Sequence, residues 1–189
     1  MKRLIVLILL MVCTGFADNA WSSPADTIKV GLGAISGFIA HEAGHYMVGF
    51  QQNTSVEYRG GLGGDMLVMQ GSRAGVKNTA AGGFMAQITS TEMILGIDSE
   101  PGSYAWGWLA YNLINAVQYV AKDQILGGYG DLDTMDRRGM DSDMFGAALV
   151  SHALWSAYRI SGGPDGGARP YVGYDPVQRE AVFGFVWKF

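Results

Sequence analysis

One short stretch constrains what this chain can fold into: residues 33–50, which carry His41-Glu42-Ala43-Gly44-His45 inside an apolar run. The apolar pattern predicts a helix, and residues four apart on a helix lie one above the other on the same face. His41 and His45 can therefore offer two imidazoles to one metal ion, while Glu42 beside them could take a proton from a metal-bound water. Of the 3 histidines in 189 residues, two fall in this motif. We predict a metal site here, with His41 and His45 as ligands and Glu42 as the catalytic base.

Two glycines lie on the same face of the predicted helix as the two histidines. Gly33 and Gly37 precede His41 and His45 at four-residue intervals, so this face carries no side chain before the ligands. Another helix or a substrate can approach such a face closely. Because each glycine costs a water-exposed helix about 1 kcal/mol, the helix must be held by its surroundings.

The first 17 residues are organised like a secretory signal peptide. Lys2 and Arg3 form a charged start, residues 4–12 form an apolar core, and Gly15-Phe16-Ala17 is a small-x-small exit. The apolar run is short for a membrane-spanning helix. We expect cleavage after Ala17 and export of the mature chain to a bacterial cell envelope, in association with a membrane.

Composition narrows the class of partner. The net charge of −4 argues against nucleic acid. Charged residues make up 16% of the chain, where about a quarter is usual, and glycine occurs 28 times. This composition favours a membrane-embedded or partly buried chain, with membrane lipid and a peptide or protein substrate as its partners.

Four apolar stretches are long enough to form helices: residues 27–50, 79–97, 104–121 and 144–158. The third has no charged residue and carries aromatic residues near its ends, as membrane-crossing helices do. The others contain Glu92, His152 or the metal motif, and would cross a membrane only with those groups facing inward. We expect a membrane-embedded bundle, and a compact helical domain is the alternative that fits the same lengths.

Two hairpins complete the predicted fold. Residues 56–59 and 66–69 are strand-like pieces on either side of a glycine-rich turn, and they form either a hairpin next to the site or a flexible surface loop. Residues 171–174 and 181–189 flank a turn at Asp175-Pro176, and the last of these alternates aromatic residues with period two. The fold class is therefore mainly α, with about four apolar helices, a small β-hairpin after the first and a C-terminal β-hairpin.

The corresponding domain organisation has three parts. They are a signal peptide at residues 1–17, a helical metal-binding domain at residues 18–161, and a linker with the terminal hairpin at residues 162–189.

The third metal ligand has four candidates. Residues 131–143 hold five aspartates after a glycine-rich turn, and one of them could bend toward the motif helix. Asp131 and Asp133 would point the same way in an extended segment, so the pattern does not choose between them. Glu92 lies on an apolar helix, where a metal would satisfy its carboxylate, and His152 is the one other imidazole. The acidic segment could instead be a solvated loop that caps the next helix, or a calcium loop that lacks the EF-hand spacing.

The motif on its apolar helix resembles the site-2 protease family of intramembrane zinc metalloproteases. In that family the first helix holds two histidine ligands and the glutamate base. The resemblance implies the same roles for His41, His45 and Glu42, with zinc as the cofactor. It covers residues 33–50 and, weakly, residues 112–133.

The second part of the resemblance concerns a later helix, which in the family carries Asn and ends in an Asp third ligand, commonly in Asn-x-x-Pro and Leu-Asp-Gly surroundings. Here Asn112 begins a similar stretch, and Leu132-Asp133 follows it. Asn115 stands in place of Pro, Thr134 replaces Gly, and the spacing is longer than in the family. The resemblance implies Asp133 as the third metal ligand.

The implied function is that of a zinc-dependent metalloprotease that cleaves peptide bonds at or within a membrane. Zinc would lower the pKa of its bound water toward about 7, and Glu42 would pass the proton to the leaving amine. An extended substrate could pair with the strands of residues 56–69. The alternative is a non-catalytic exported membrane protein that has no metal or has a structural site, with His41, His45, Asp133 and His152 as four ligands.

Overall fold

The computed structural model of the chain describes residues 23–58, 67–97, 101–126, 130–160, 169–175 and 180–186. The helices of this part are α3 (Pro24–Gln51), α4 (Arg73–Ile97), α5 (Ser103–Leu126), α6 (Asp131–Arg137) and α7 (Ser142–Ile160). Its strands are β1 (Ser55–Tyr58), β2 (Leu67–Gln70), β3 (Arg169–Asp175) and β4 (Glu180–Val186). The predicted signal peptide at residues 1–17 lies outside the described residues and stays a prediction.

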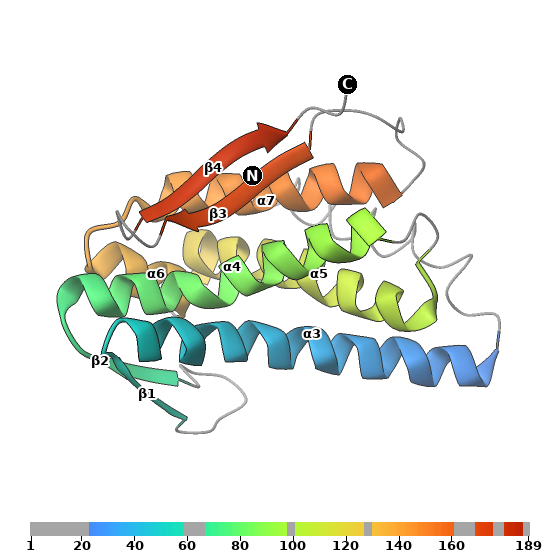
Figure 1. Cartoon of the computed structure of the whole chain (residues 1–189), viewed down its shortest axis with the longest axis horizontal. Coiled ribbons are helices and arrows are strands. Elements are labelled where there is room, and N and C mark those ends of the chain that lie inside the picture. The colour runs from blue at the N-terminus through green and yellow to red at the C-terminus, as the bar shows by residue number, and fades with distance from the viewer. Residues whose placement is uncertain are drawn as a thin grey trace.

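Helix α3 packs along both α4 and α5, and α7 packs against α5 on the side away from α3 (Figure 1). Strands β1 and β2 form an antiparallel hairpin at the C-terminal end of α3, with Ser55 opposite Gln70 and Tyr58 opposite Leu67. Strands β3 and β4 form a second antiparallel hairpin, in which Arg169 pairs with Val186. The chain is therefore mainly helical, and each of its small sheets is a two-stranded hairpin.

Local sequence signals fix both ends of α3. The Ser23 side chain accepts a hydrogen bond from the Asp26 backbone N–H (3.2 Å), and Pro24 occupies the first helical position. A serine cap, an early proline and an acidic residue in the first turn all favour a helix start. At the other end, Asn53 has a φ of 50°, a conformation that asparagine tolerates better than most residues. The chain leaves the helix there and enters β1.

Glycines bring the backbones of three helices into contact. A Cβ added at Gly33 of α3 would overlap the Tyr104 carbonyl oxygen of α5. Gly44 of α3 and Gly82 of α4 face each other, and a Cβ at Gly82 would lie 2.6 Å from the Gly44 carbonyl oxygen. Real Cβ atoms do not approach so closely, so only glycine allows these crossings.

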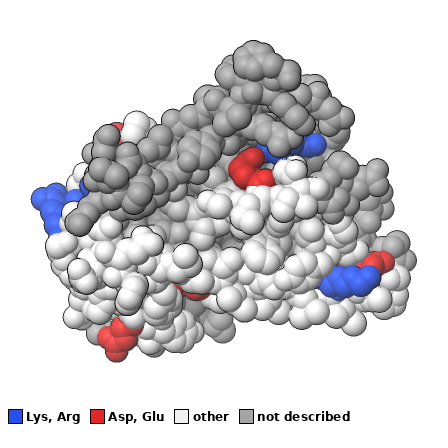
Figure 2. Space-filling model, in the orientation of Figure 1, with Lys and Arg blue, Asp and Glu red and all other residues white. Residues whose placement is uncertain are grey.

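Helix α3 buries its small residues and exposes its bulky ones. Its buried residues are Gly33, Gly37, His41, Gly44, His45 and Gly49. Its large exposed apolar side chains include Ile28, Leu32, Ile35, Ile39, Met47 and Phe50. Charged side chains are few on the face shown in Figure 2, whose lower half, where α3 lies in Figure 1, is mostly uncharged. Backbone proximity, rather than side-chain size, decides which face of α3 is buried.

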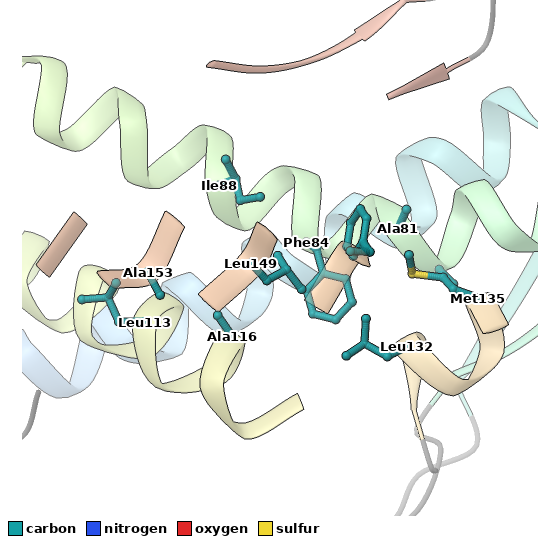
Figure 3. Close-up of a cluster of buried hydrophobic side chains, with 11 residues drawn as sticks. Ala81, Phe84, Ile88, Leu113, Ala116, Leu132, Met135, Leu149 and Ala153 are labelled. Carbon is teal, nitrogen blue, oxygen red and sulfur yellow. The ribbon is translucent and has the colours of Figure 1, made fainter. Parts of the chain in front are cut away.

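The apolar core lies between α4, α5, α6 and α7, with Phe84 of α4 at its centre (Figure 3). Phe84 is fully buried and contacts the ring of Phe145 on α7, with the ring centroids 5.8 Å apart. Leu132 and Met135 of α6 belong to the same cluster and are also buried. This burial fixes the orientation of α6, and with it the direction of Asp131, the first residue of that helix.

The prediction of membrane-embedded helices is wrong for the part of the chain that the structure describes. None of its helices combines the length and the apolarity that crossing a membrane requires. The apolar stretches are interrupted by polar side chains that the bundle uses internally, such as Gln87 of α4 and Asn112 and Asn115 of α5, all three of which are buried.

The acidic segment also differs from expectation. Residues that the sequence suggested as a loop form the seven-residue helix α6. Asp141 does precede the next helix as a cap, because its Oδ1 accepts a hydrogen bond from the Met144 backbone N–H (2.9 Å).

A pair of glycine-to-alanine variants tests the role of close backbone contact. Gly33→Ala should force α3 and α5 apart and lower the free energy of unfolding by about 1–3 kcal/mol, the usual cost of overpacking. The matched control is Gly31→Ala on the same helix, where an added Cβ would meet nothing within 4 Å. This control should raise the free energy of unfolding by about 0.5–1 kcal/mol, because alanine favours helix. Chemical denaturation measures both, and equal stabilities would contradict the proposed contact.

Candidate metal centre

Three buried side chains converge between α3 and α6. His41 and His45 come from α3, and Asp131 is the first residue of α6. The two Nε2 atoms lie 3.3 Å apart, and the Asp131 Oδ2 atom lies 3.5 Å from Nε2 of His41 and 3.4 Å from Nε2 of His45. All three residues are less than a tenth exposed. Two imidazoles and one carboxylate in this arrangement could hold a metal ion.

His45 is oriented by the backbone of α4. Its Nδ1–H donates a hydrogen bond to the Thr79 carbonyl oxygen, at 2.8 Å. In the unprotonated imidazole this bond places the one ring proton on Nδ1, so that the lone pair of Nε2 is directed at the other two side chains. Ligand histidines in metalloproteins are usually held in this way by their second nitrogen.

His41 is oriented by aromatic packing. Its ring contacts the edge of Phe84, with centroids 5.4 Å apart, and lies 5.8 Å from the ring of Tyr119 on α5. Its Nδ1 atom is buried and has no hydrogen-bond partner among the described residues. Packing of these rings directs Nε2 of His41 toward the side chains of His45 and Asp131.

Asp131 reaches the two histidines because α6 begins at that residue. Gly130 just before it has a φ of 113°, which side chains disfavour, and the first α6 backbone hydrogen bond runs from Thr134 N–H to the Gly130 carbonyl oxygen (2.9 Å). Met135 lies one turn after Asp131 on the same face and is fully buried in the core. Burial of Met135 therefore turns Asp131 inward.

Asp133, the residue implied by the family resemblance, lies elsewhere. Successive helical residues rotate by about 100°, so residues two apart point in nearly opposite directions. The Asp133 carboxylate forms an ion pair with Arg137 of the same helix, at 2.7 Å. The structure brings Asp131, and not Asp133, to the two imidazoles.

Helix α4 closes one side of the centre through Gly83. A Cβ at this position would collide with Nε2 of His45 and lie 2.8 Å from Cε1 of His41. The backbone of α4 therefore rests directly on the two imidazole rings. The sequence reasoning missed Gly83, although the Gly82-Gly83 pair inside an apolar helix is the kind of signal that marks a close approach.

The other two candidate ligands bind each other. Nε2 of His152 on α7 lies 3.0 Å from Oε1 of Glu92 on α4, and Nη1 of Arg159 donates to both Glu92 oxygens, at 2.9 and 2.7 Å. Burial raises the pKa of Glu92, but the hydrogen bonds from His152 and Arg159 outweigh it and hold the pKa below its usual value. Glu92 is thus an ionised partner of His152 and Arg159, in a cluster that joins α4 to α7.

The two asparagines of the family resemblance face α4. The Asn112 amide donates to the Gln87 carbonyl oxygen (3.1 Å) and to the Thr91 hydroxyl (2.9 Å), and the Asn115 amide donates to the Gln87 side-chain oxygen (2.9 Å). The Gln87 amide in turn donates to the Asn112 carbonyl oxygen. This network begins one helical turn after Gly83 and fixes α5 to α4 beside the metal-binding group.

Glu42 is half-buried next to His41 on α3. Burial raises the pKa of Glu42 above its ordinary value, a rise that His41 and His45 oppose and Asp131 reinforces. A carboxylate whose pKa is raised accepts a proton more readily, which suits a general base. Glu42 is outside the group of three side chains that converge, so it remains available for that role.

No family model matches this chain, and the comparisons with curated proteins and with solved structures found no match. Its function must therefore be argued from the geometry of the His41, His45 and Asp131 group.

The first prediction for this group concerns pH. Burial lowers the pKa of His45, but the Asp131 carboxylate, the hydrogen bonds to Asp131 and Thr79, and Glu42 raise it to about 9. A metal binds the unprotonated imidazole, so below pH 9 one proton must leave His45 for each metal bound. Zinc affinity should rise about tenfold per pH unit from about pH 6.5 to 8.5, and level off above about pH 9.

Competition with a chelator of known zinc affinity measures this at each pH. A zinc affinity that stays constant over the same range would show that His45 carries no proton in the metal-free protein.

The second prediction concerns the two neighbouring aspartates. A residue that only supports a ligand typically changes metal affinity by about 10–100-fold when it is removed. Asp131→Ala should exceed this range and match His45→Ala, because a ligand is lost. Asp133→Ala removes only the ion pair with the exposed Arg137 and should change zinc affinity less than about threefold. If Asp133→Ala were the more damaging variant, Asp133 and not Asp131 would be the ligand.

Proposed function

We propose that this protein is a zinc-dependent hydrolase of peptide bonds, with His41, His45 and Asp131 as the metal ligands and Glu42 as the general base. The observation that carries the proposal is that three candidate ligands converge, while the neighbouring Glu42 is not one of them. Structural zinc sites usually have four protein ligands, whereas catalytic sites have three and keep one position for water or substrate. The fourth candidate, His152 on α7, instead forms a hydrogen bond with Glu92 on α4.

The distances within the group fit a tetrahedral ion such as zinc. Zinc bonds to nitrogen and oxygen are about 2.0–2.1 Å long, and the ligands of a tetrahedral ion at that bond length lie about 3.3–3.4 Å apart. The observed separations are 3.3, 3.4 and 3.5 Å. An octahedral ion with the same bond length would need about 2.8–3.0 Å between neighbouring ligands. The two Nε2 atoms and the Asp131 Oδ2 atom therefore fit three corners of a tetrahedron.

The ionised state of the Asp131 carboxylate supports the binding of a cation. Burial raises the pKa of Asp131, but the two histidines outweigh this effect and hold the pKa well below its usual value. The carboxylate is therefore ionised while buried, which proteins tolerate when it is paired or coordinates a metal. A divalent cation would also satisfy the lone pairs of both Nε2 atoms.

A zinc ion held by His41, His45 and Asp131 would supply Lewis-acid chemistry, which lowers the pKa of water and polarises a scissile carbonyl group. Glu42 accepts the proton from the attacking water, because its raised pKa makes it a good acceptor. The protonated Glu42 then gives this proton to the nitrogen of the leaving amine. The α4 backbone at Gly83 covers the imidazoles on one side and limits access of bulk water there.

The position of the β1–β2 hairpin supports an extended peptide as the substrate. Val56 of β1 packs on Gly49, one helical turn after His45, so that a Cβ at Gly49 would lie 2.7 Å from the Val56 side chain. In the described residues each of these strands pairs only with the other, which leaves backbone donors and acceptors on the outer edges. An extended peptide can add to such an edge as a further strand. We infer that the substrate is bound in extended form across this hairpin.

The experiment that tests the proposal separates zinc binding from hydrolysis. Glu42→Gln should keep one zinc per chain and lower hydrolysis of a fluorogenic peptide library by about 10²–10⁴-fold, the usual contribution of a general base. His41→Ala should lose both zinc and activity. Asp136→Asn, an exposed carboxylate of α6, is the matched control and should change neither.

Two results would contradict the proposal. Zinc loss in Glu42→Gln as severe as in His41→Ala would make Glu42 a ligand. Wild-type activity in Glu42→Gln would exclude it as the base. A wild-type protein that binds zinc tightly but hydrolyses no peptide of the library would favour the alternative of a structural metal site.

A further inference from the structure

We propose that Tyr119 of α5 is a positioning residue for the metal centre, which holds Asp131 through its hydroxyl group and holds His41 and Gly130 through its ring. The inference rests on the metal-binding part of the proposed function. Sequence reasoning treated Tyr119 only as one of the aromatic residues near the end of an apolar segment.

The first observation is that the ring is fixed in place. Phe84 contacts it edge to face, with centroids 4.9 Å apart and an interplanar angle of 87°. The His41 ring is its second contact, with the ring centroids 5.8 Å apart and an interplanar angle of 36°. Such offset aromatic contacts are favourable and directional. The rings of Phe84 and His41 also contact each other, with centroids 5.4 Å apart, so the Tyr119 ring packs against both of them and restrains the first metal ligand.

The second observation is that the turn before Asp131 rests on the same ring. A Cβ at Gly130 would lie 2.9 Å from Cε1 of Tyr119, which is closer than real Cβ atoms come. Gly130 also has a φ of 113°, so glycine is required there by both space and conformation. The ring edge is therefore the surface against which the chain turns into α6.

The third observation concerns the hydroxyl group. The Tyr119 side chain makes a hydrogen bond with the Asp131 side chain. A carboxylate only accepts hydrogen bonds, so the phenol O–H is the donor. A donated bond of this kind restrains rotation of the carboxylate, whose Oδ2 atom must face two imidazoles at once.

Asp131 needs this support more than the other ligands do. His41 and His45 are fixed relative to each other because they lie one turn apart on a 28-residue helix. Asp131 lies at the first position of a helix of 7 residues, and no side chain caps that helix start. Tyr119 lies on α5, which packs along α3, so it links the third ligand to the helix that carries the first two.

Tyr119→Phe tests the proposal, because it removes only the hydroxyl group. Zinc affinity, measured by chelator competition at fixed pH, should fall about 10–100-fold, the range typical of residues that support a ligand. The visible absorption of the cobalt-substituted protein should also shift, because the carboxylate changes its position at the metal. Circular dichroism and thermal unfolding of the metal-free protein should stay close to wild type.

The matched control is Tyr111→Phe on the same helix. Tyr111 is half-buried near Glu42 and Asp131, and burial and these two charges raise its pKa, but no hydrogen bond to Asp131 contributes. Its zinc affinity should change less than about threefold, and its cobalt spectrum should not move.

A second variant reaches the same contact from the other side. Gly130→Ala leaves Tyr119 intact but places a methyl group against its ring, and it should weaken zinc binding at least as much as Tyr119→Phe. It also keeps the proposal testable if Tyr119→Phe fails to fold.

The outcomes separate this inference from the proposed function. Wild-type zinc affinity and an unchanged cobalt spectrum in Tyr119→Phe would overturn the positioning role, as would wild-type zinc affinity in a folded Gly130→Ala. Failure of the wild-type protein to bind zinc would instead overturn the proposed function itself.

Discussion

The metal centre depends on how closely the backbone of α3 approaches α4 and α5. Gly44 and Gly82 allow α3 and α4 to touch, and Gly83 lets the α4 backbone lie on the imidazoles of His41 and His45. The same approach puts the Thr79 carbonyl oxygen within 2.8 Å of His45 Nδ1. A methyl group at any of these glycines would widen the gap and remove the hydrogen bond that orients His45. Glycines therefore hold α3 against α4 and α5, whereas bulky apolar residues form the core between α4, α5, α6 and α7.

The second constraint is that every buried charge near the core must find a partner of opposite sign. Among the described residues, two separate clusters join buried or half-buried charged and titratable groups of different helices. Asp131 lies with His41 and His45, while Glu92 lies with His152 and Arg159 between α4 and α7. The second cluster is complete as it stands, because a carboxylate faces a guanidinium and an imidazole. The first has converging ligand atoms and no permanent cation, which is why it is the one suited to a metal.

Helix α6 shows how a local change of secondary structure selects a ligand. In an extended segment Asp131 and Asp133 would point to the same side, whereas in a helix they point to nearly opposite sides. Burial of Leu132 and Met135 against Phe84 then decides which of the two faces inward. The result pairs Asp133 with Arg137 and leaves Asp131 with the histidines. The ring of Tyr119 and the backbone of Gly130 set the point at which this helix starts.

The sequence by itself determined the helical motif and therefore the pairing of His41 with His45, because residues four apart on a helix must share a face. It also indicated the mainly helical composition and the positions of both hairpins, which depend on local periodicity and turn residues. It could not choose the third ligand or identify Tyr119, since these depend on contacts between segments far apart in the chain. It also suggested helices that cross a membrane, because apolar runs do not reveal that Gln87, Asn112 and Asn115 satisfy one another inside a bundle. Only the tertiary structure decided which polar groups meet, because hydrogen bonds and ion pairs between helices depend on distances that no local pattern encodes.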